Sequence, residues 1–453
     1  MNEKLKIGDI CEINITDISS TGEGIGRSNG FTLFASGILP GETAKVQITK
    51  MNKNFGLAET IEKTTLSDKR ISPPCQFYEN CGGCNIMHLD YEEGLKYKGS
   101  GIVQNLKRIG KVNSIENIKI TPSPEIFHYR NNMQFPVGYD RNSVYVGLYS
   151  NKSHIVIPVD NCILADKGSS QVIQIVEQFL NETGLTAYDT KTGRGTVRHI
   201  SYRTNKHLTE KMVTIVINAD SLKNSDTLAE RLSTVEGMKS INVNINKNPN
   251  SPTFGHITKN IWGQEGYITD FIGKYQFRVA PDAFFQVNPH ITDVMYKKVL
   301  EFANPTKSDE VIDAYCGAGT ISIFISEYVK KVIGVDISES SIANANTNSA
   351  LNSILNTEFI HGDATDVIPN LLNKGKRPNI IIVDPPRKGL NQKMINAIKS
   401  AKIRKIVYVS CDNATLARDI KQFSEVGYSV KGIEAFDMFC WSCHVETVCL
   451  LEL

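Results

Sequence analysis

Long hydrophobic runs are missing from this sequence. No apolar stretch approaches the ~18 residues that a membrane-spanning helix needs, so we expect no membrane partner. The opening residues, MNEKLKIGDI, carry charges where a signal peptide needs an apolar segment, which favours a cytoplasmic protein. A large excess of one charge is missing too. The formal net charge is only +2, so any nucleic-acid surface must be a local patch.

The chain is long, and it contains several cysteines. Its 453 residues are enough for two or three domains, and 41% hydrophobic with 22% charged residues is typical of a globular protein. The 10 cysteines of an intracellular chain fit metal ligands, a catalytic thiol and core positions better than a set of disulfides. No protein partner is evident from the sequence.

The first 62 residues predict a small β-barrel of the OB-like kind, a common RNA-binding scaffold. Its apolar stretches are short and cover 10–15, 31–34, 44–48 and 56–61. Turn-rich pieces separate them, among them Gly22–Gly26. A structural module without a ligand remains the alternative, because this segment is not basic overall.

Three closely spaced cysteines predict a metal or cluster site at Cys75, Cys81 and Cys84. Either a tetrahedral zinc or an iron–sulfur cluster needs a fourth thiolate, and Cys162 is the candidate. The spacing does not separate zinc from iron–sulfur. It does disfavour a radical enzyme, whose usual three-cysteine spacing is different.

Residues of mixed character follow from about 125 to 280, and we interpret them as a second domain. Between Lys191 and Lys211 basic residues alternate with aromatic ones, a pattern that suits phosphate contact and base stacking. For any single residue there, a solvated strand face is the alternative.

From Pro281 onward the pattern predicts a doubly wound α/β sheet. Strand Val311–Ala314 leads into a glycine loop, and a second strand ends in Asp336, where a carboxylate can bind ribose hydroxyls. Ser322 breaks the G-x-G-x-x-G dinucleotide pattern. Asp313, which ends the first strand, looks instead like the first motif of S-adenosylmethionine-dependent methyltransferases, where it faces the amino-acid end of the cofactor.

Cys411 lies at the tip of a predicted buried strand, Lys405–Ser410, just before a predicted helix. That position is the crevice where open α/β sheets bind ligands, and the helix dipole there favours a thiolate. A buried, inert cysteine is the alternative.

The final strand carries Glu446 on the same face as Val448 and Leu450. A carboxylate on an apolar face should have a raised pKa, which suits a base near neutrality. A structural ion pair is the alternative. Together with Cys411 and S-adenosylmethionine, Glu446 suggests methylation at C5 of a pyrimidine: the thiolate adds at C6, C5 takes the methyl group, and the base removes the C5 proton. Asp384 would bind the uracil edge or frame the cofactor.

These motifs together resemble the RNA uracil-5-methyltransferase family, and most of all its 23S rRNA members with a TRAM domain and a 4Fe–4S cluster. The resemblance rests on the cysteine set and on Phe284–Asn288, Asp313–Gly317, Asp384-Pro385-Pro386-Arg387, Ser410-Cys411 and His444-Val445-Glu446.

The resemblance implies a class I (Rossmann-like) methyltransferase domain (91–124 and 281–453), a TRAM barrel (1–62) and a central α+β domain (70–90 and 125–280). It implies Cys411 as nucleophile and Glu446 as base. The cofactor contacts that it implies are Gln286, Tyr315, Asp336 and Asp384. It also implies that Cys75, Cys81, Cys84 and Cys162 hold iron–sulfur rather than zinc.

Two departures stand out: Asp336 where the family usually has Glu, and Cys440-Trp441-Ser442-Cys443, which we interpret as a diverged substrate loop rather than a redox pair. A tRNA uracil-5-methyltransferase and an iron–sulfur RNA-binding protein without methyltransferase activity are the alternatives. Arg387 argues against an exocyclic-amine methyltransferase, which has a stacking aromatic there.

Overall fold

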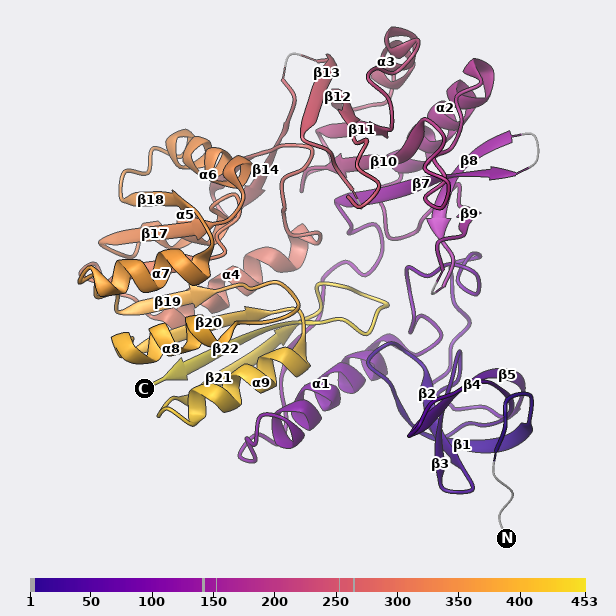
Figure 1. Cartoon of the computed structure of the whole chain (residues 1–453), viewed down its shortest axis with the longest axis horizontal. Coiled ribbons are helices and arrows are strands. Elements are labelled where there is room, and N and C mark those ends of the chain that lie inside the picture. The colour runs from indigo at the N-terminus through magenta and orange to yellow at the C-terminus, as the bar shows by residue number, and fades with distance from the viewer. Residues whose placement is uncertain (1–4, 141–142, 152, 252, 264) are drawn as a thin grey trace.

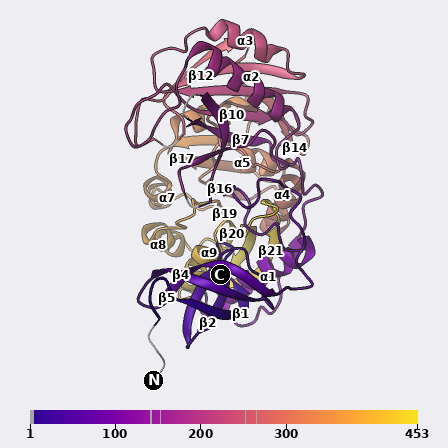
Figure 2. The same cartoon turned by 90° about the vertical axis from the view of Figure 1, so that its right-hand side faces the viewer.

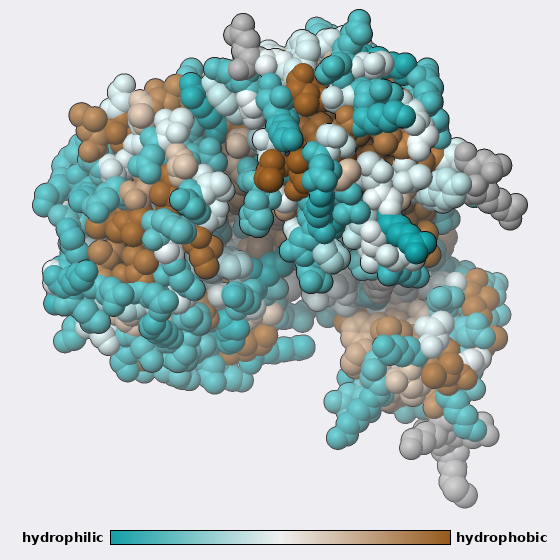
Figure 3. Space-filling view, turned by 45° about the horizontal axis from the view of Figure 1, so that its top comes forward, coloured by the Kyte–Doolittle hydropathy of each residue, from teal (hydrophilic) through white to brown (hydrophobic). Residues whose placement is uncertain are grey.

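The structure is a computed structural model that describes residues 5–140, 143–151, 153–251, 253–263 and 265–453. It contains a closed barrel, a seven-stranded sheet, a two-stranded sheet and an eight-stranded sheet (Figure 1). The barrel and the seven-stranded sheet lie at opposite ends in the side view of Figure 2, and the barrel protrudes as a separate lobe in Figure 3. Among the described residues, no helix is long and apolar enough to cross a membrane.

The N-terminal barrel closes in the strand order β1-β2-β3-β5-β4. Its strands are β1 (Ile10–Ile18), β2 (Gly24–Ser28), β3 (Phe31–Ala35), β4 (Thr43–Met51) and β5 (Phe55–Thr65). The prediction of a turn at Gly22–Gly26 is wrong in part, because β2 begins inside it. A side chain at Gly24 would place its Cβ 2.6 Å from an Ile38 methyl group, so the glycine allows β2 to pass close to Ile38.

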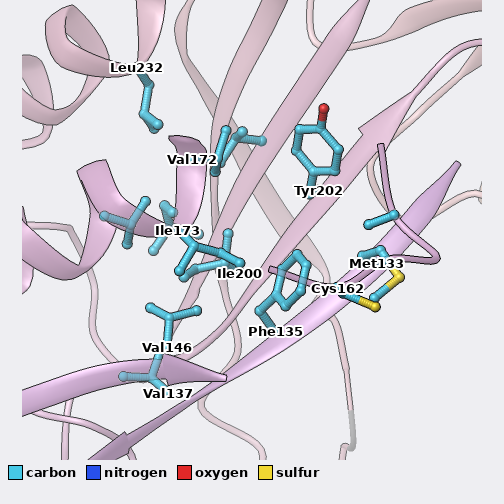
Figure 4. Packing of buried hydrophobic residues seen from close by; sticks show 14 of the residues in the cluster. Met133, Phe135, Val137, Val146, Cys162, Val172, Ile173, Ile200, Tyr202 and Leu232 are labelled. Carbon is cyan, nitrogen blue, oxygen red and sulfur yellow. The ribbon is translucent and has the colours of Figure 1, made fainter. Parts of the chain in front are cut away.

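The central sheet has the order β13-β12-β11-β10-β7-β8-β9. Its strands are β7 (Asn132–Asp140), β8 (Ser143–Tyr149), β9 (Val156–Pro158), β10 (Val197–Thr204), β11 (Lys211–Ile217), β12 (Met238–Ile245) and β13 (Ile257–Trp262). Helices α2 (Gly168–Thr183) and α3 (Ser225–Ser233) cover one face. Val172 and Ile173 of α2 pack there against Phe135 and Ile200 of the sheet, and Cys162 lies at the edge of this core (Figure 4).

The eight-stranded sheet follows the order β18-β17-β16-β19-β20-β22-β21-β6. Its strands are β6 (Ile120–Thr121), β16 (Glu310–Ala314), β17 (Lys331–Asp336), β18 (Thr357–His361), β19 (Ile380–Val383), β20 (Lys405–Ser410), β21 (Ser429–Phe436) and β22 (Glu446–Glu452). The last two strands form an antiparallel pair in which β22 lies between β20 and β21, and the short strand β6 pairs outside β21.

Helices flank this sheet on both faces (Figure 1). They are α4 (Pro289–Ala303), α5 (Thr320–Ser326), α6 (Glu339–Leu351), α7 (Ala364–Asn373), α8 (Gln392–Ala401) and α9 (Asn413–Ser424). The two-stranded sheet, β14 (Ile268–Ile272) and β15 (Tyr275–Val279), precedes them. Helix α1 (Tyr91–Arg108) comes from much earlier in the chain and packs against α9.

A buried ion pair anchors the loop that leads into β22. Lys98 of α1 donates to Asp437, and the exposed fractions of the two side chains are only 2% and 0%. Tyr91 adds a hydrogen bond to the same carboxylate at 2.7 Å. Later in the loop, Trp441 stacks on Phe127, with ring centroids 5.4 Å apart. The loop 437–444 is therefore held by segments more than 300 positions away in the sequence.

We predict that Lys98→Ala lowers the free energy of unfolding by about 3–5 kcal/mol, because it leaves the Asp437 carboxylate buried without its cation. Lys45→Ala is the matched control. Lys45 forms an exposed pair with Glu62 at 3.0 Å, and because water screens this pair its loss should leave the free energy of unfolding almost unchanged. Urea unfolding followed by circular dichroism measures both. Equal effects of the two variants would contradict this account of the loop.

Candidate active site

The order of the parallel strands reverses between β16 and β19, and ligands of open α/β sheets bind outside the strand ends at such a point. The loop after β16 makes a tight turn here. Tyr315, Gly317 and Gly319 have φ angles of 66°, 53° and 79°, in the left-handed region that favours glycine. Tyr315 is half-buried against the core beneath the loop, at the position predicted for a cofactor contact.

Asp336 ends β17 next to this loop. One carboxylate oxygen accepts a hydrogen bond from the Gly317 N–H at 2.9 Å, and the other accepts from the Ser338 N–H at 2.8 Å. The side chain is half-buried, and each carboxylate oxygen has a second lone pair. Asp336 thus fixes the glycine loop and retains acceptors for ribose hydroxyls.

Asp313, predicted to face the amino-acid end of the cofactor, has one carboxylate oxygen without a hydrogen-bond partner among the described residues. Its side chain is completely buried and accepts a hydrogen bond from the Ser322 hydroxyl at 2.6 Å. Burial raises the pKa of Asp313 to about 7, although the Ser322 hydrogen bond opposes this. The carboxyl group therefore ties the end of β16 to α5 from below the loop.

Gln286 is nearly buried, just before the helix that Asn288 caps. Its backbone carbonyl accepts a hydrogen bond from the Asn131 side chain at 3.0 Å, and the Asn131 N–H donates to the Val287 carbonyl, also at 3.0 Å. The position of Gln286 therefore depends on Asn131, a residue of the central region.

Cys411 and Glu446 are brought together by the pairing of β20 with β22. These strands are antiparallel, and Ser410 pairs with Thr447. The next positions outward along this ladder are Cys411 and Glu446, and opposed residues of an antiparallel pair project to the same face. Glu446 is only 5% exposed, whereas Cys411 is half-buried and more accessible.

Asp384 joins this pair from β19, the strand on the other side of β20. Burial and then the Asp384 carboxylate raise the pKa of Glu446 to about 8. Burial and then the Asp313 carboxylate raise the pKa of Asp384 to about 7. The candidate site thus holds carboxyl groups that exchange protons near neutral pH, as the apolar face of Glu446 predicted.

The prediction of a thiolate at Cys411 is wrong for the free protein. Burial and then the Glu446 carboxylate raise the pKa of the Cys411 thiol to about 11, against the opposing effect of Arg387. The helix α9 does begin after Cys411, but the Asp412 carboxylate accepts from the N–H groups of Ala414 (3.1 Å) and Thr415 (2.9 Å). This acidic cap offsets the positive end of the helix dipole.

The sequence assigned no role in the site to two further side chains, those of Arg387 and Tyr296. The Arg387 guanidinium lowers the pKa of both Cys411 and Glu446, and it lies 3.5 Å from the Nε2 atom of His444. The Tyr296 hydroxyl, fully buried in α4, hydrogen-bonds to Thr320 at 2.8 Å. Arg387 was visible after Asp-Pro-Pro, whereas Tyr296 looked like one more member of an apolar helix face.

The four predicted metal-ligating cysteines line one cavity of about 700 Å³ between the 75–84 loop and β7–β9. They are Cys75, Cys81, Cys84 and Cys162. Burial raises the pKa of Cys81, Cys84 and Cys162, and the other cysteines of the set contribute to each shift. Among the described residues, no three His, Cys, Asp or Glu side chains converge closely enough for a single metal ion.

Much of the basic stretch Lys191–Lys211 turns inward rather than forming a phosphate-binding face. Arg198, Arg203 and Lys211 are buried, and the Lys206 ammonium pairs with the Asp293 carboxylate. Only part of the stretch, including Lys191, is exposed. The reason is that β10 and β11 are inner strands of the central sheet, so side chains on both of their faces are covered.

Comparison with known proteins gives a consistent result along the chain. Residues 90–453 match the family model tRNA (uracil-5-)-methyltransferase, and residues 4–61 match the TRAM domain. An uncharacterized RNA methyltransferase of Halalkalibacterium halodurans is 38% identical over 446 residues, which are 98% of this chain and 97% of the relative. One of Clostridium acetobutylicum is 38% identical over 445 residues, covering 97% and 96%.

A solved structure shares nearly the whole fold. The tRNA (uracil-54, C5)-methyltransferase of Pyrococcus abyssi, in complex with S-adenosyl-L-homocysteine, superimposes with a TM-score of 0.78 at 25% identity and covers 97% of this chain and 100% of its own. The family match spans most of the chain, and the fold agrees with it. The protein therefore belongs to the tRNA (uracil-5-)-methyltransferase family, and it is an RNA methyltransferase with an S-adenosylmethionine-dependent fold and an N-terminal TRAM domain.

Proposed function

We propose that this protein transfers a methyl group from S-adenosylmethionine to C5 of a specific uridine in RNA, and that the RNA is 23S rRNA. The observation that carries the reaction is the pairing of β20 with β22, which sets Cys411 beside Glu446. The TRAM barrel together with the four-cysteine set supports the ribosomal target. Because the Pyrococcus abyssi neighbour is named for a uridine of tRNA, tRNA is the alternative target.

The chain's own residues divide the chemistry as follows. Gln286, Tyr315 and Asp336 would hold S-adenosylmethionine at the glycine loop, where it would supply a methyl group carried on a sulfonium. The Cys411 sulfur adds to C6 of the uracil ring, which makes C5 a nucleophile for that methyl group. Because the thiol is protonated in the free protein, its proton must leave as the C–S bond forms, and we assign Asp384 as its acceptor.

Glu446 completes the turnover. After the methyl group is on C5, the Glu446 carboxylate removes the C5 proton, the double bond re-forms and the Cys411 sulfur leaves C6. A carboxylate whose pKa is raised to about 8 is a stronger base than an exposed one, and its burial keeps water away from the covalent adduct. Arg387 holds positive charge beside the sulfur throughout.

We further propose that Cys75, Cys81, Cys84 and Cys162 hold a 4Fe–4S cluster. The donor set fits: four thiols share one cavity whose volume, about 700 Å³, exceeds that of a single ion. A zinc ion would need sulfurs about 3.8 Å apart, as its tetrahedral ~2.3 Å bonds require. Among the described residues, no three donors lie close enough together for a single ion. The Gly83 N–H also donates to the Cys81 sulfur at 3.4 Å, the kind of hydrogen bond that stabilises cluster thiolates.

Three functional domains follow from this proposal. The TRAM barrel comprises 1–62, the cluster-bearing RNA-binding domain 70–90 and 125–280, and the methyltransferase domain 91–124 and 281–453. The assignment of 91–124 to the methyltransferase domain is supported by α1, which packs on α9, and by β6, which extends the eight-stranded sheet.

We predict that Cys411→Ala lowers the methyl-transfer rate by more than about 1000-fold, because no sulfur can then add to C6. S-adenosylmethionine affinity should stay unchanged. The assay measures transfer of labelled methyl groups to rRNA and tRNA from cells that lack the protein, followed by mapping of the methylated uridine. Cys443→Ala, which removes another half-buried thiol, is the control. Residual turnover in Cys411→Ala would rule out the nucleophile.

For Glu446→Gln we expect a covalent protein–RNA adduct to accumulate, because elimination stalls after methylation. In the wild type the raised pKa keeps Glu446 protonated below about pH 8, so the rate should rise about tenfold per pH unit toward that value. A denaturing gel detects the adduct, and Glu452→Gln at the far end of β22 should show none. Normal turnover by Glu446→Gln would assign the base elsewhere.

Protein purified without oxygen should contain about four irons per chain and be brown. Cys84→Ser should lose this iron and its visible absorption, whereas Cys11→Ser, in the barrel, should keep both. Metal analysis and absorption spectra of the three proteins make the comparison. One zinc per chain in the wild type would overturn the cluster.

A further inference from the structure

A second large cavity, of about 760 Å³, opens on the central sheet. None of its wall residues belongs to the candidate active site. Four tyrosines line it: Tyr139, Tyr145, Tyr149 and Tyr188. This tyrosine cavity is of the size typical of ligand sites.

Two of these tyrosines are fixed walls and two are accessible. The Tyr145 hydroxyl donates to the Val156 carbonyl at 2.8 Å, and its ring lies against Gly138, where a Cβ would come within 2.5 Å of it. Tyr188 is only 9% exposed, whereas the exposed fractions of Tyr139 and Tyr149 are 59% and 43%. Exposed aromatic rings beside a rigid aromatic wall make a platform for stacking.

The cavity also carries positive charge that no carboxylate neutralises directly. The Arg198 guanidinium stacks on Tyr188, 4.4 Å from the ring centroid, and donates to the carbonyls of Asn246, Asn248 and Ser251. No ion pair of Arg198 occurs within the described part of the chain. The one acidic wall residue, Asp189, accepts hydrogen bonds from the backbone N–H groups of its own turn. Lys191 adds a second, exposed cation.

His199 contributes a polar group without a partner. The residue is only 7% exposed, and its Nε2 atom has no hydrogen-bond partner among the described residues. Burial and then Arg198 lower the pKa of His199 to about 4, so the ring is neutral at pH 7. A neutral imidazole is better suited to hydrogen-bond with the edge of a base than to bind a phosphate.

Three neighbouring cavities lead from the barrel to the tyrosine cavity, which is the last of them. The cavity between the barrel and the cysteine loop shares Tyr78, Cys81 and Cys84 with the cysteine cavity. The cysteine cavity in turn shares Tyr149 and His154 with the tyrosine cavity. The tyrosine cavity therefore terminates a hollowed surface that starts at the TRAM domain.

We propose that the tyrosine cavity binds an unpaired nucleotide of the RNA substrate, other than the uridine that is methylated, with its base stacked on Tyr139 and Tyr149. Aromatic faces beside positive charge are a common means of holding single-stranded bases, and Lys191 is the exposed cation here. This inference rests on the proposed function for its ligand, and it adds a second point at which the enzyme recognises the RNA.

The test uses the full-length protein and a 12-nucleotide single-stranded RNA of mixed sequence that carries one 2-aminopurine. Wild-type protein should quench the probe's fluorescence by stacking. Tyr139→Ala and Tyr149→Ala should each weaken RNA binding about tenfold and reduce the quenching. Tyr139→Phe, which keeps the ring, should behave like the wild type.

Tyr328→Ala is the matched control, because Tyr328 is also 43% exposed but follows α5 in the methyltransferase sheet. In methylation assays the two cavity variants should raise KM for RNA and leave kcat unchanged. The iron content of Tyr149→Ala is checked as well, since Tyr149 also borders the cysteine cavity. Unchanged binding and quenching in both alanine variants would overturn the proposal, whatever the methylation activity.

A second measurement needs no variant. Irradiation of wild-type protein bound to an RNA that contains 4-thiouridine should give cross-linked peptides from 137–140, 143–149 or 186–199. Cross-links confined to other segments would contradict the tyrosine cavity. If the wild type binds and cross-links here but methylates no RNA, the cavity stands and the proposed reaction fails.

Discussion

The antiparallel pairing of β22 with β20 is the constraint on which the active site depends. All the other strands from β16 to β20 run in parallel, so only their carboxyl ends meet at the ligand edge. Because β22 runs the opposite way, its first residue reaches that edge instead of its last one. Glu446, only seven positions from the C-terminal Leu453, thereby lies beside Cys411.

The start of β22 is held from outside the methyltransferase sheet. Lys98 of α1 pairs with Asp437, and the Asn85 side chain accepts a hydrogen bond from the Cys443 N–H at 2.9 Å. Asn85 directly follows the loop that carries Cys75, Cys81 and Cys84. The cysteine loop therefore contacts the segment that leads into Glu446.

The site concentrates acidic groups where burial disfavours their charge. Asp313, Asp384 and Glu446 all have a raised pKa, and each carboxylate makes ionisation of its neighbour harder. Arg387 opposes this effect at Glu446 and Cys411. The result is a set of groups that gain and lose protons close to neutral pH, as the two proton transfers of the proposed reaction require.

The sequence by itself determined the strand before Cys411, the helix after it and the apolar face that Glu446 shares, because each depends on residues within a few positions along the chain. Prediction from the sequence failed where residues far apart along the chain determine the structure. The strand β2, the protonated thiol of Cys411 and the inward-turned Arg203 all follow from neighbours that only the fold brings close. Burial and charge are properties of the three-dimensional surroundings, so tertiary structure alone determined the protonated thiol of Cys411 and the tyrosine cavity.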